Sequence, residues 1–162
     1  MFLKALLVAL WVTWGLIDEQ TFQFQTTRPI ITGPVVGLIL GDVKTGLLVG
    51  ATVELMFLAV VFVGTAVPPD PTLSSAIATA FAILSGKGAD IAVATALPVA
   101  LIGQVVTTLQ YTVVNVFFLH RGDKYAAEGN LRGLTLMNTL PLLMNFIFYG
   151  LPAFLAVYYG PT

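Results

Sequence analysis

Long apolar runs alternate with short polar tips along the whole chain. The runs cover about residues 2–17, 29–40, 46–67, 72–84, 91–119 and 134–160. A helix needs about 20 apolar residues to cross the roughly 30 Å hydrocarbon core of a bilayer. Three runs are long enough, namely 46–67, 91–119 and 134–160, and the first run is marginal at 16 residues. We therefore expect an all-α, polytopic integral membrane protein, with the polar stretch 120–132 as its longest loop.

Two of the runs are too short to cross a membrane. Residues 29–40 would form a helix of about 18 Å, and residues 72–84 one of about 20 Å. Each leads through a glycine-rich charged tip into a long run. Paired short segments broken by Gly and Pro are typical of a transporter's binding site, because irregular backbone at membrane depth needs protein or water around it. The pattern predicts two short–tip–long helical hairpins of re-entrant or broken helices, although short tilted helices in a bundle would show it too.

Glycines recur with helical spacing in the first of these units. Gly33, Gly37 and Gly41 lie four residues apart, and so do Gly46 and Gly50. Residues four apart share one face of a helix, and small residues on that face let two helices approach closely. We expect the two halves of this hairpin to pack backbone to backbone, and a sliding surface for a moving domain is the alternative.

Composition agrees with a lipid-facing surface and excludes several classes of function. Of the 162 residues, 57% are hydrophobic and 9% are charged, against about 25% charged in soluble domains. The net charge of −1 and the absence of cysteine exclude a basic nucleic-acid footprint, disulfides and a phosphocysteine carrier. The one histidine, His120, has no sequence neighbour that would orient its ring. We expect no cofactor, no metal site and no phospho-acceptor residue, so enzymatic activity within the chain itself is left open.

Glu54 is the one ionisable side chain inside the long apolar run 46–64. An ionised group in the middle of a membrane helix costs about 2.5–3.5 kcal/mol or more, and such residues are functional by default. No residue at helical spacing compensates its charge. The Glu54 carboxyl must therefore be protonated, face a wet cavity or meet a partner from elsewhere in the chain. We predict that it binds substrate, with a buried packing role as the alternative.

A second candidate follows the residues Pro68-Pro69-Asp70-Pro71, which cannot form regular helix. Asp70 can cap the next helix, with proline at the first helical position. A helix start that carries Asp70, Thr72 and Ser74 offers both acceptors and donors, as a polyhydroxylated ligand requires. In the run 91–119, Gln104 is the polar residue that we add to the substrate-binding set, although such residues more often form bonds between helices.

Four segments carry a resemblance to a known family. They are Leu16–Ile31, Gly37–Met56, Gly64–Pro71 and Asp123–Asn130. Together they resemble the IIC membrane component of the mannose–fructose–sorbose family of the bacterial phosphoenolpyruvate-dependent sugar phosphotransferase system. Order and spacing agree from about residue 15 to residue 135.

The resemblance implies a sugar-translocating membrane subunit. It implies a IID-like membrane partner that completes the sugar path, and cytoplasmic IIB and IIA phospho-carriers that phosphorylate the sugar as it enters. It places Glu54 and the Asp70 region at or near the sugar site, with the segment Asp18–Arg28 in the same core. A multi-pass location in the bacterial inner membrane and a homo-oligomeric complex are expected on the same basis.

Members of that family run well beyond 162 residues. We therefore expect residues 1–162 to be a single transmembrane domain, the N-terminal portion of a IIC-like permease that is C-terminally truncated or split between genes. Two alternatives to the sugar permease stay open at this point. One is a proton-coupled small-solute transporter that uses Glu54, and the other is a non-transporting truncated scaffold.

Overall fold

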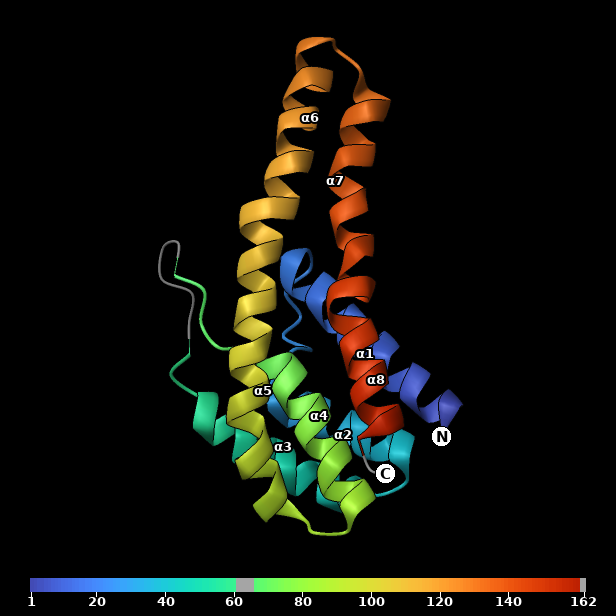
Figure 1. Ribbon diagram of the computed structural model, residues 1–162, viewed down its shortest axis with the longest axis vertical. Coiled ribbons are helices and arrows are strands. Elements are labelled where there is room, and N and C mark those ends of the chain that lie inside the picture. Colours follow the sequence, from blue (N-terminus) through green and yellow to red (C-terminus); the bar gives the residue numbers. More distant parts are fainter. Residues whose placement is uncertain (61–65, 161–162) are drawn as a thin grey trace.

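The computed structural model describes residues 1–60 and 66–160, and every regular element in these two ranges is a helix. The expected all-α architecture is confirmed. The elements are α1 (Phe2–Gln20), α2 (Pro29–Leu40), α3 (Val43–Phe57), α4 (Pro71–Ser85), α5 (Ala89–Leu109), η1 (Gln110–Val114), α6 (Asn115–Ala127), α7 (Leu131–Asn145), η2 (Phe146–Gly150) and α8 (Leu151–Tyr159). Because η1 and η2 are short π-helical segments, α5–η1–α6 and α7–η2–α8 are two continuous long helices (Figure 1).

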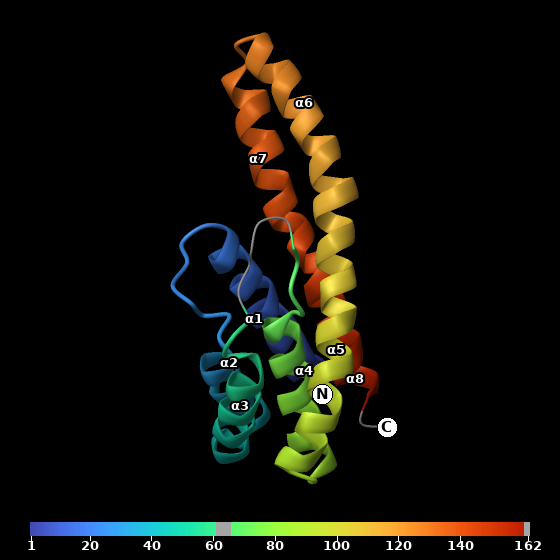
Figure 2. The ribbon, with the colours of Figure 1, turned by 90° about the vertical axis from the view of Figure 1, so that its left-hand side faces the viewer.

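The fold consists of a helical body and a long arm. Helices α6 and α7 run side by side away from the body and meet in a turn at the arm's tip (Figure 1). The tips of the α2–α3 and α4–α5 hairpins lie at the opposite end in both views (Figures 1 and 2). The two long helices, Ala89–Ala127 and Leu131–Tyr159, are long and apolar enough to cross a membrane. Helices α2 and α4 are apolar but shorter, as the hairpin prediction requires.

Helix α4 lies at the centre of the body. Figure 2 shows it between the α2–α3 pair and α5. One face of α4 packs into a core with α1, α2 and α8, and the other face packs with α3 and α5. Two of its buried hydroxyls bond within the helix: Ser74 Oγ donates to the Pro71 carbonyl (3.1 Å) and Ser75 Oγ to the Thr72 carbonyl (3.1 Å). Small side chains and internal bonds let an apolar helix that carries several hydroxyl groups occupy the middle of the body.

Helices α2 and α3 approach each other closely at the regularly spaced glycines. A Cβ atom added at Gly33 would lie 2.6 Å from the Gly50 Cα atom, and one added at Gly46 would lie 2.9 Å from the Gly37 Cα atom. Nothing larger than hydrogen fits between the two backbones at these positions. The expected backbone-to-backbone packing is confirmed.

The tip of this hairpin is held by the side chain of Asp42. Gly41 ends α2 in the left-handed region (φ 101°), and Asp42 then caps α3. Thr45 donates its hydroxyl (2.6 Å) and its backbone N–H (3.0 Å) to the Asp42 carboxylate. These two bonds, the hydroxyl first, hold the pKa of Asp42 below its usual value because they stabilise the charged form.

Two boundaries differ from the prediction. The run 46–67 does not form one long helix: α3 ends at Phe57, and residues 61–65 lie outside the described part of the chain. Gly50 already lies against the Pro29 carbonyl at the start of α2, so a longer α3 would extend past its packing partner. The first hairpin is therefore short–tip–short, and only the α4–α5 hairpin has a long second helix.

The second difference concerns the polar stretch 120–132, which was expected to be a loop. Helix α6 continues to Ala127, and the turn before α7 is short. Most residues of this stretch are compatible with a helix, and α6 continues through the single Gly122; the helix ends before Gly129 (φ 66°) and Asn130, the N-cap of α7.

A buried amide chain joins the two π-helical segments to α1. Gln110 Nε2 donates to Asn145 Oδ1 (2.7 Å), and Asn145 Nδ2 donates to Gln20 Oε1 (3.0 Å). Gln110 begins η1, and Asn145 directly precedes η2. Both side chains are buried, so the amides connect the arm to the body where each long helix leaves it.

Gln110→Leu is expected to destabilise the fold by about 1–3 kcal/mol, because it leaves the buried Asn145 Oδ1 atom without a donor. The effect is measurable as a lower midpoint of thermal unfolding in detergent. Thr112→Val is the control, since its exposed hydroxyl bonds only within its own helix (2.7 Å to the Thr108 carbonyl), and it should stay within about 0.5 kcal/mol. Equal midpoints for both variants would contradict a structural role for the amide chain.

Candidate functional site

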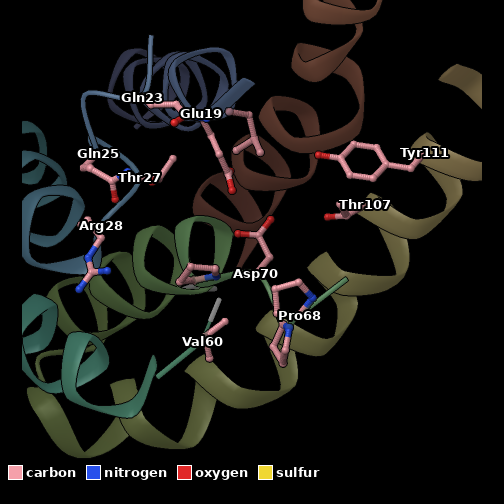
Figure 3. Close-up of a pocket in the computed structure, with 13 residues that line it drawn as sticks. Glu19, Gln23, Gln25, Thr27, Arg28, Val60, Pro68, Asp70, Thr107 and Tyr111 are labelled. Atoms are coloured by element: carbon pink, nitrogen blue, oxygen red, sulfur yellow. The ribbon is translucent and has the colours of Figure 1, made fainter. Parts of the chain in front are cut away.

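A cavity of about 290 Å³ opens where the loop after α1, the start of α4 and the end of α5 meet. This volume is near the lower end of cavities that hold small ligands, roughly 300–1,000 Å³. We call it the central pocket, and Figure 3 shows its lining. The lining residues are Leu16, Glu19, Gln23, Gln25, Thr27, Arg28, Val60, Pro68, Pro69, Asp70, Pro71, Thr107 and Tyr111.

Asp70 lines this pocket and also caps α4, which confirms the helix cap that the sequence allowed. Its Oδ1 atom accepts the backbone N–H groups of Thr72 (2.8 Å) and Leu73 (3.0 Å). Its own N–H donates to the Ala100 carbonyl (3.1 Å), which ties the irregular segment to α5. Both bonds that the carboxylate accepts from the described residues end on Oδ1, which leaves Oδ2 for another donor. The cap and the functional reading of Asp70 are therefore compatible.

A glycine on α5 makes room for that carboxylate. A Cβ atom added at Gly103 would lie 2.6 Å from the Asp70 Cβ atom and 3.3 Å from Oδ2. One helical turn later, the Thr107 hydroxyl donates to the Gly103 carbonyl (2.9 Å) and accepts from the Tyr149 hydroxyl (2.7 Å). Thr107 thus presents a remaining lone pair rather than a proton to the pocket.

Sequence reasoning did not single out Glu19, although it lines the pocket. Figure 3 shows its carboxyl pointing toward that of Asp70, with the hydroxyls of Tyr111 and Thr107 on the opposite wall. Asp18 and Glu19 follow an apolar run, where the polar residues that flank any membrane helix are expected. Apart from the family resemblance of Asp18–Arg28, nothing in the sequence therefore indicated that Glu19 lines a pocket. In the structure, Glu19, Gln23, Gln25, Thr27 and Arg28 of that segment line the same pocket as Asp70.

Glu54 lies outside the described lining of the pocket and meets a partner instead. Its carboxylate forms an ion pair with Arg28, which does line the pocket, and also accepts the Ile30 backbone N–H (3.3 Å). The Glu54 side chain is 14% exposed and that of Arg28 is 39% exposed. Of the three outcomes that the sequence allowed, compensation by a distant residue is the one observed. The position of Glu54 makes it a support for Arg28.

The other three candidates surround the Asp70 segment without lining the pocket. The Thr72 backbone N–H donates to the capping Asp70 carboxylate, and the Thr72 hydroxyl donates to the Thr27 carbonyl (3.4 Å). Ser74 is fully buried and bonds within α4. Gln104 Nε2 donates to the Val67 carbonyl (2.6 Å) just before Pro68. Thr72 and Gln104 thus bond directly to the irregular segment that presents Asp70, whereas Ser74 bonds to the first residue of α4.

The described residues contain no group of three or more His, Cys, Asp or Glu side chains that could hold a metal ion. The central pocket instead combines carboxylates, hydroxyls, amides and one guanidinium. This set of donors and acceptors suits an uncharged ligand with several hydroxyl groups.

Comparison with known proteins decides the family. The sequence pattern of the sorbose-specific IIC component of the phosphotransferase system matches residues 2–162. The chain belongs to this family. Proteins of the family are integral membrane proteins, in agreement with the two membrane-length helices of the described residues.

Relatives with different sugar names align with the chain. It is 40% identical over 121 residues to the fructose permease IIC component of Bacillus subtilis (strain 168), covering 75% of this chain and 45% of the relative. It is 41% identical over 131 residues to the sorbose-specific EIIC component of Klebsiella pneumoniae, covering 81% and 49%. It is 36% identical over 139 residues to the mannose-specific EIIC component of Escherichia coli (strain K12), covering 86% and 50%. The chain spans about half the length of these relatives.

The fold is shared with a solved transporter. A chain in the cryo-EM structure of the mannose transporter ManYZ with microcin E492 (MceA) superposes with a TM-score of 0.93 at 32% identity. The match covers 100% of this chain and 65% of that chain. The body-and-arm architecture is therefore the architecture of that region of the transporter.

Proposed function

We propose that this chain is the sugar-translocating membrane subunit of a mannose-family phosphotransferase system and that it binds a hexose in the central pocket. The observation that carries the proposal is the convergence of the Glu19 and Asp70 carboxyls with two hydroxyls in a cavity of this family's fold (Figure 3). The relatives' names include fructose, sorbose and mannose, which supports a hexose as ligand.

The pocket's chemistry suits that ligand. Carboxylate oxygens accept hydrogen bonds from neighbouring sugar hydroxyls, and charged acceptors form the stronger bonds. Asp70 Oδ2 and Glu19 are the acceptors in this proposal, and Arg28 and Tyr111 supply donors. Four further residues support these groups without contacting the sugar. Glu54 orients Arg28 through their ion pair. The segment that carries Asp70 is held by Thr72, Ser74 and Gln104.

Transport involves partners in this proposal. The chain lacks cysteine and has one histidine, so phosphate comes from a IIB subunit fed by IIA. A IID-like membrane subunit completes the sugar path, as the two-subunit name of the similar transporter suggests. Residues 1–162 act as one transmembrane unit in the bacterial inner membrane, within a homo-oligomeric complex, and alternating access moves the sugar past a site near the bilayer midplane.

The two alternatives receive less support. A proton-coupled transporter would use Glu54 as its protonation site, but the Glu54 carboxylate is already engaged in an ion pair with Arg28. A scaffold without transport would not need a pocket lined by two carboxylates and a guanidinium.

Glu54→Gln is expected to lower hexose uptake about tenfold without changing membrane insertion, because the isostere removes the charge that holds Arg28. A tenfold loss is at the low end of the range expected when one member of a charge pair is removed, because the Arg28 side chain is 39% exposed and water screens the pair. Uptake is measured in a host without other mannose-type permeases, with the chain expressed from its own locus beside its IIB and IID partners.

Glu128→Gln, on the exposed turn of the arm, is the matched control and should transport normally. Uptake must also stop when the phospho-carriers are deleted. Uptake that survives that deletion but is abolished by an uncoupler would replace the proposal with proton coupling. Unchanged kinetics in Glu54→Gln would refute the role of the Arg28 pair.

A further inference from the structure

The loop between α1 and α2 holds two glutamines in an unusual backbone conformation. Gln23 (φ 57°) and Gln25 (φ 65°) are the non-glycine residues with positive φ in the described ranges. The left-handed region favours Gly and, to a lesser extent, Asn, and a longer side chain there carries a steric cost. Both glutamines line the central pocket (Figure 3). A costly conformation beside a ligand cavity indicates that the side chain itself is required.

Asp18 holds this loop in place. Its carboxylate is fully buried and accepts three bonds: Oδ1 from the Phe24 N–H (2.8 Å), and Oδ2 from the Thr26 N–H (2.9 Å) and hydroxyl (2.6 Å). Its carbonyl also accepts the N–H of Gln23 (2.7 Å). The bonded positions lie directly beside and between the two glutamines, so Asp18 defines the backbone from which both amides project.

The residues that alternate with the glutamines lie outside the pocket lining. Phe22 stacks on Trp14 (centroids 6.3 Å apart) and on Phe24 (5.5 Å apart). This aromatic stack is outside the lining, whereas Gln23 and Gln25 belong to it. The loop is thus divided into an aromatic outer side and an amide side that borders the pocket.

We infer that Gln23 and Gln25 are specificity-determining residues that distinguish one hexose from another, with Asp18 as their positioning residue. The inference rests on the proposed function. Carboxylates accept a bond from almost any hydroxyl, so Asp70 and Glu19 favour sugars in general. A side-chain amide offers a donor and an acceptor in fixed relation, and it therefore responds to the orientation of a hydroxyl or to an acetamido group. The left-handed backbone sets the direction in which each glutamine side chain leaves the loop.

The test is a comparison of sugars in Gln23→Gly and Gln25→Gly. Glycine tolerates the left-handed backbone and removes the whole side chain, the amide included. Uptake of D-mannose, D-fructose, L-sorbose and N-acetyl-D-galactosamine is measured in the complete transport system. For at least one variant, the ratio of kcat/KM between the preferred sugar and another should shift about tenfold, mainly through KM, because a hydroxyl then loses its partner.

Companion variants separate positioning from general damage. Gln25→Asn retains an amide and suits the left-handed region, so it should keep part of the original preference. Asp18→Asn should shift the ratio in the same direction as the glycine variants, since one of its two oxygens becomes a donor. Phe22→Leu, on the aromatic side, should leave the ratio unchanged.

The outcomes distinguish this inference from the proposed function. Unchanged sugar ratios in both glycine variants, with normal wild-type uptake, overturn the inference and leave the sugar-permease proposal standing. An equal loss for all four sugars also overturns it, because that result assigns the loop a general structural role. Absence of hexose uptake by the wild type overturns both.

Discussion

Replacing Asp70 with asparagine should reduce hexose uptake about 10- to 100-fold while the protein stays folded. Asparagine is as good a helix cap as aspartate, so it can still accept the Thr72 and Leu73 N–H groups through Oδ1. The change affects the other atom: Oδ2, a charged acceptor beside the pocket, becomes an amide donor. A hydrogen bond to a charged group contributes about 1.5–3 kcal/mol, which corresponds to the expected factor.

Two measurements separate this effect from misfolding. The midpoint of thermal unfolding in detergent should match that of the wild type. Asp90→Asn is the matched control, because Asp90 is an exposed aspartate in the first turn of α5 and should transport normally. Uptake by Asp70→Asn within about twofold of the wild type would remove Asp70 from the sugar site and would favour a purely structural cap.

Gly33→Ala should disrupt the α2–α3 hairpin more than any other single methyl group added to that interface. The new Cβ atom would lie 2.6 Å from the Gly50 Cα atom and 2.9 Å from its nitrogen, and also against the Gly46 carbonyl. All three neighbours are backbone atoms, which cannot move away by changing a rotamer. The two helices would have to separate, at a cost of about 1–3 kcal/mol or more. The expected result is a lower unfolding midpoint and less protein inserted in the membrane.

Gly122→Ala is the matched control for that substitution. Gly122 lies in α6, and its added Cβ atom would meet nothing closer than 3.8 Å. Since alanine is the better helix former by about 1 kcal/mol, this variant should be neutral or more stable. If Gly33→Ala behaved like Gly122→Ala, the tight packing of α2 on α3 would not limit the stability of the fold.

Much of the fold could be predicted from the hydrophobic pattern. Alternating apolar runs and glycine-rich tips located the helices and the two hairpins, because the cost of placing polar groups in lipid acts on every residue of a run. The glycine spacing located the α2–α3 contact, and Pro71 after Asp70 located the start of α4. Boundaries that depend on neighbours were wrong: α3 ends at Phe57 where α2 no longer covers it, and α6 extends through a polar stretch.

The site was predicted in part, and the division has a physical cause. Asp70 attracted attention because the prolines on both sides of it prevent regular helix there, and this effect acts within one or two residues. Glu54 attracted attention as a lone charge, yet its partner is 26 residues away in sequence, and the helix pair alone brings the two together. No feature of the neighbouring sequence indicates that the Glu19 side chain lines the pocket. The predictions of Glu54, Asp70, Thr72, Ser74 and Gln104 as ligand contacts all stay untested. Of the five, Asp70 alone belongs to the described pocket lining, and the positions of the other four favour supporting roles.

The sequence by itself determined that this chain is a helical membrane protein, which family it resembles and where its backbone must break, since hydropathy, proline and glycine act within a few residues. The tertiary structure alone decided which polar groups face a common cavity. It paired Arg28 with Glu54 and brought Glu19 opposite Asp70. It also turned Gln23 and Gln25 into left-handed positions at the pocket's edge through the buried Asp18. Such groupings arise from contacts between distant segments, and no local pattern encodes them.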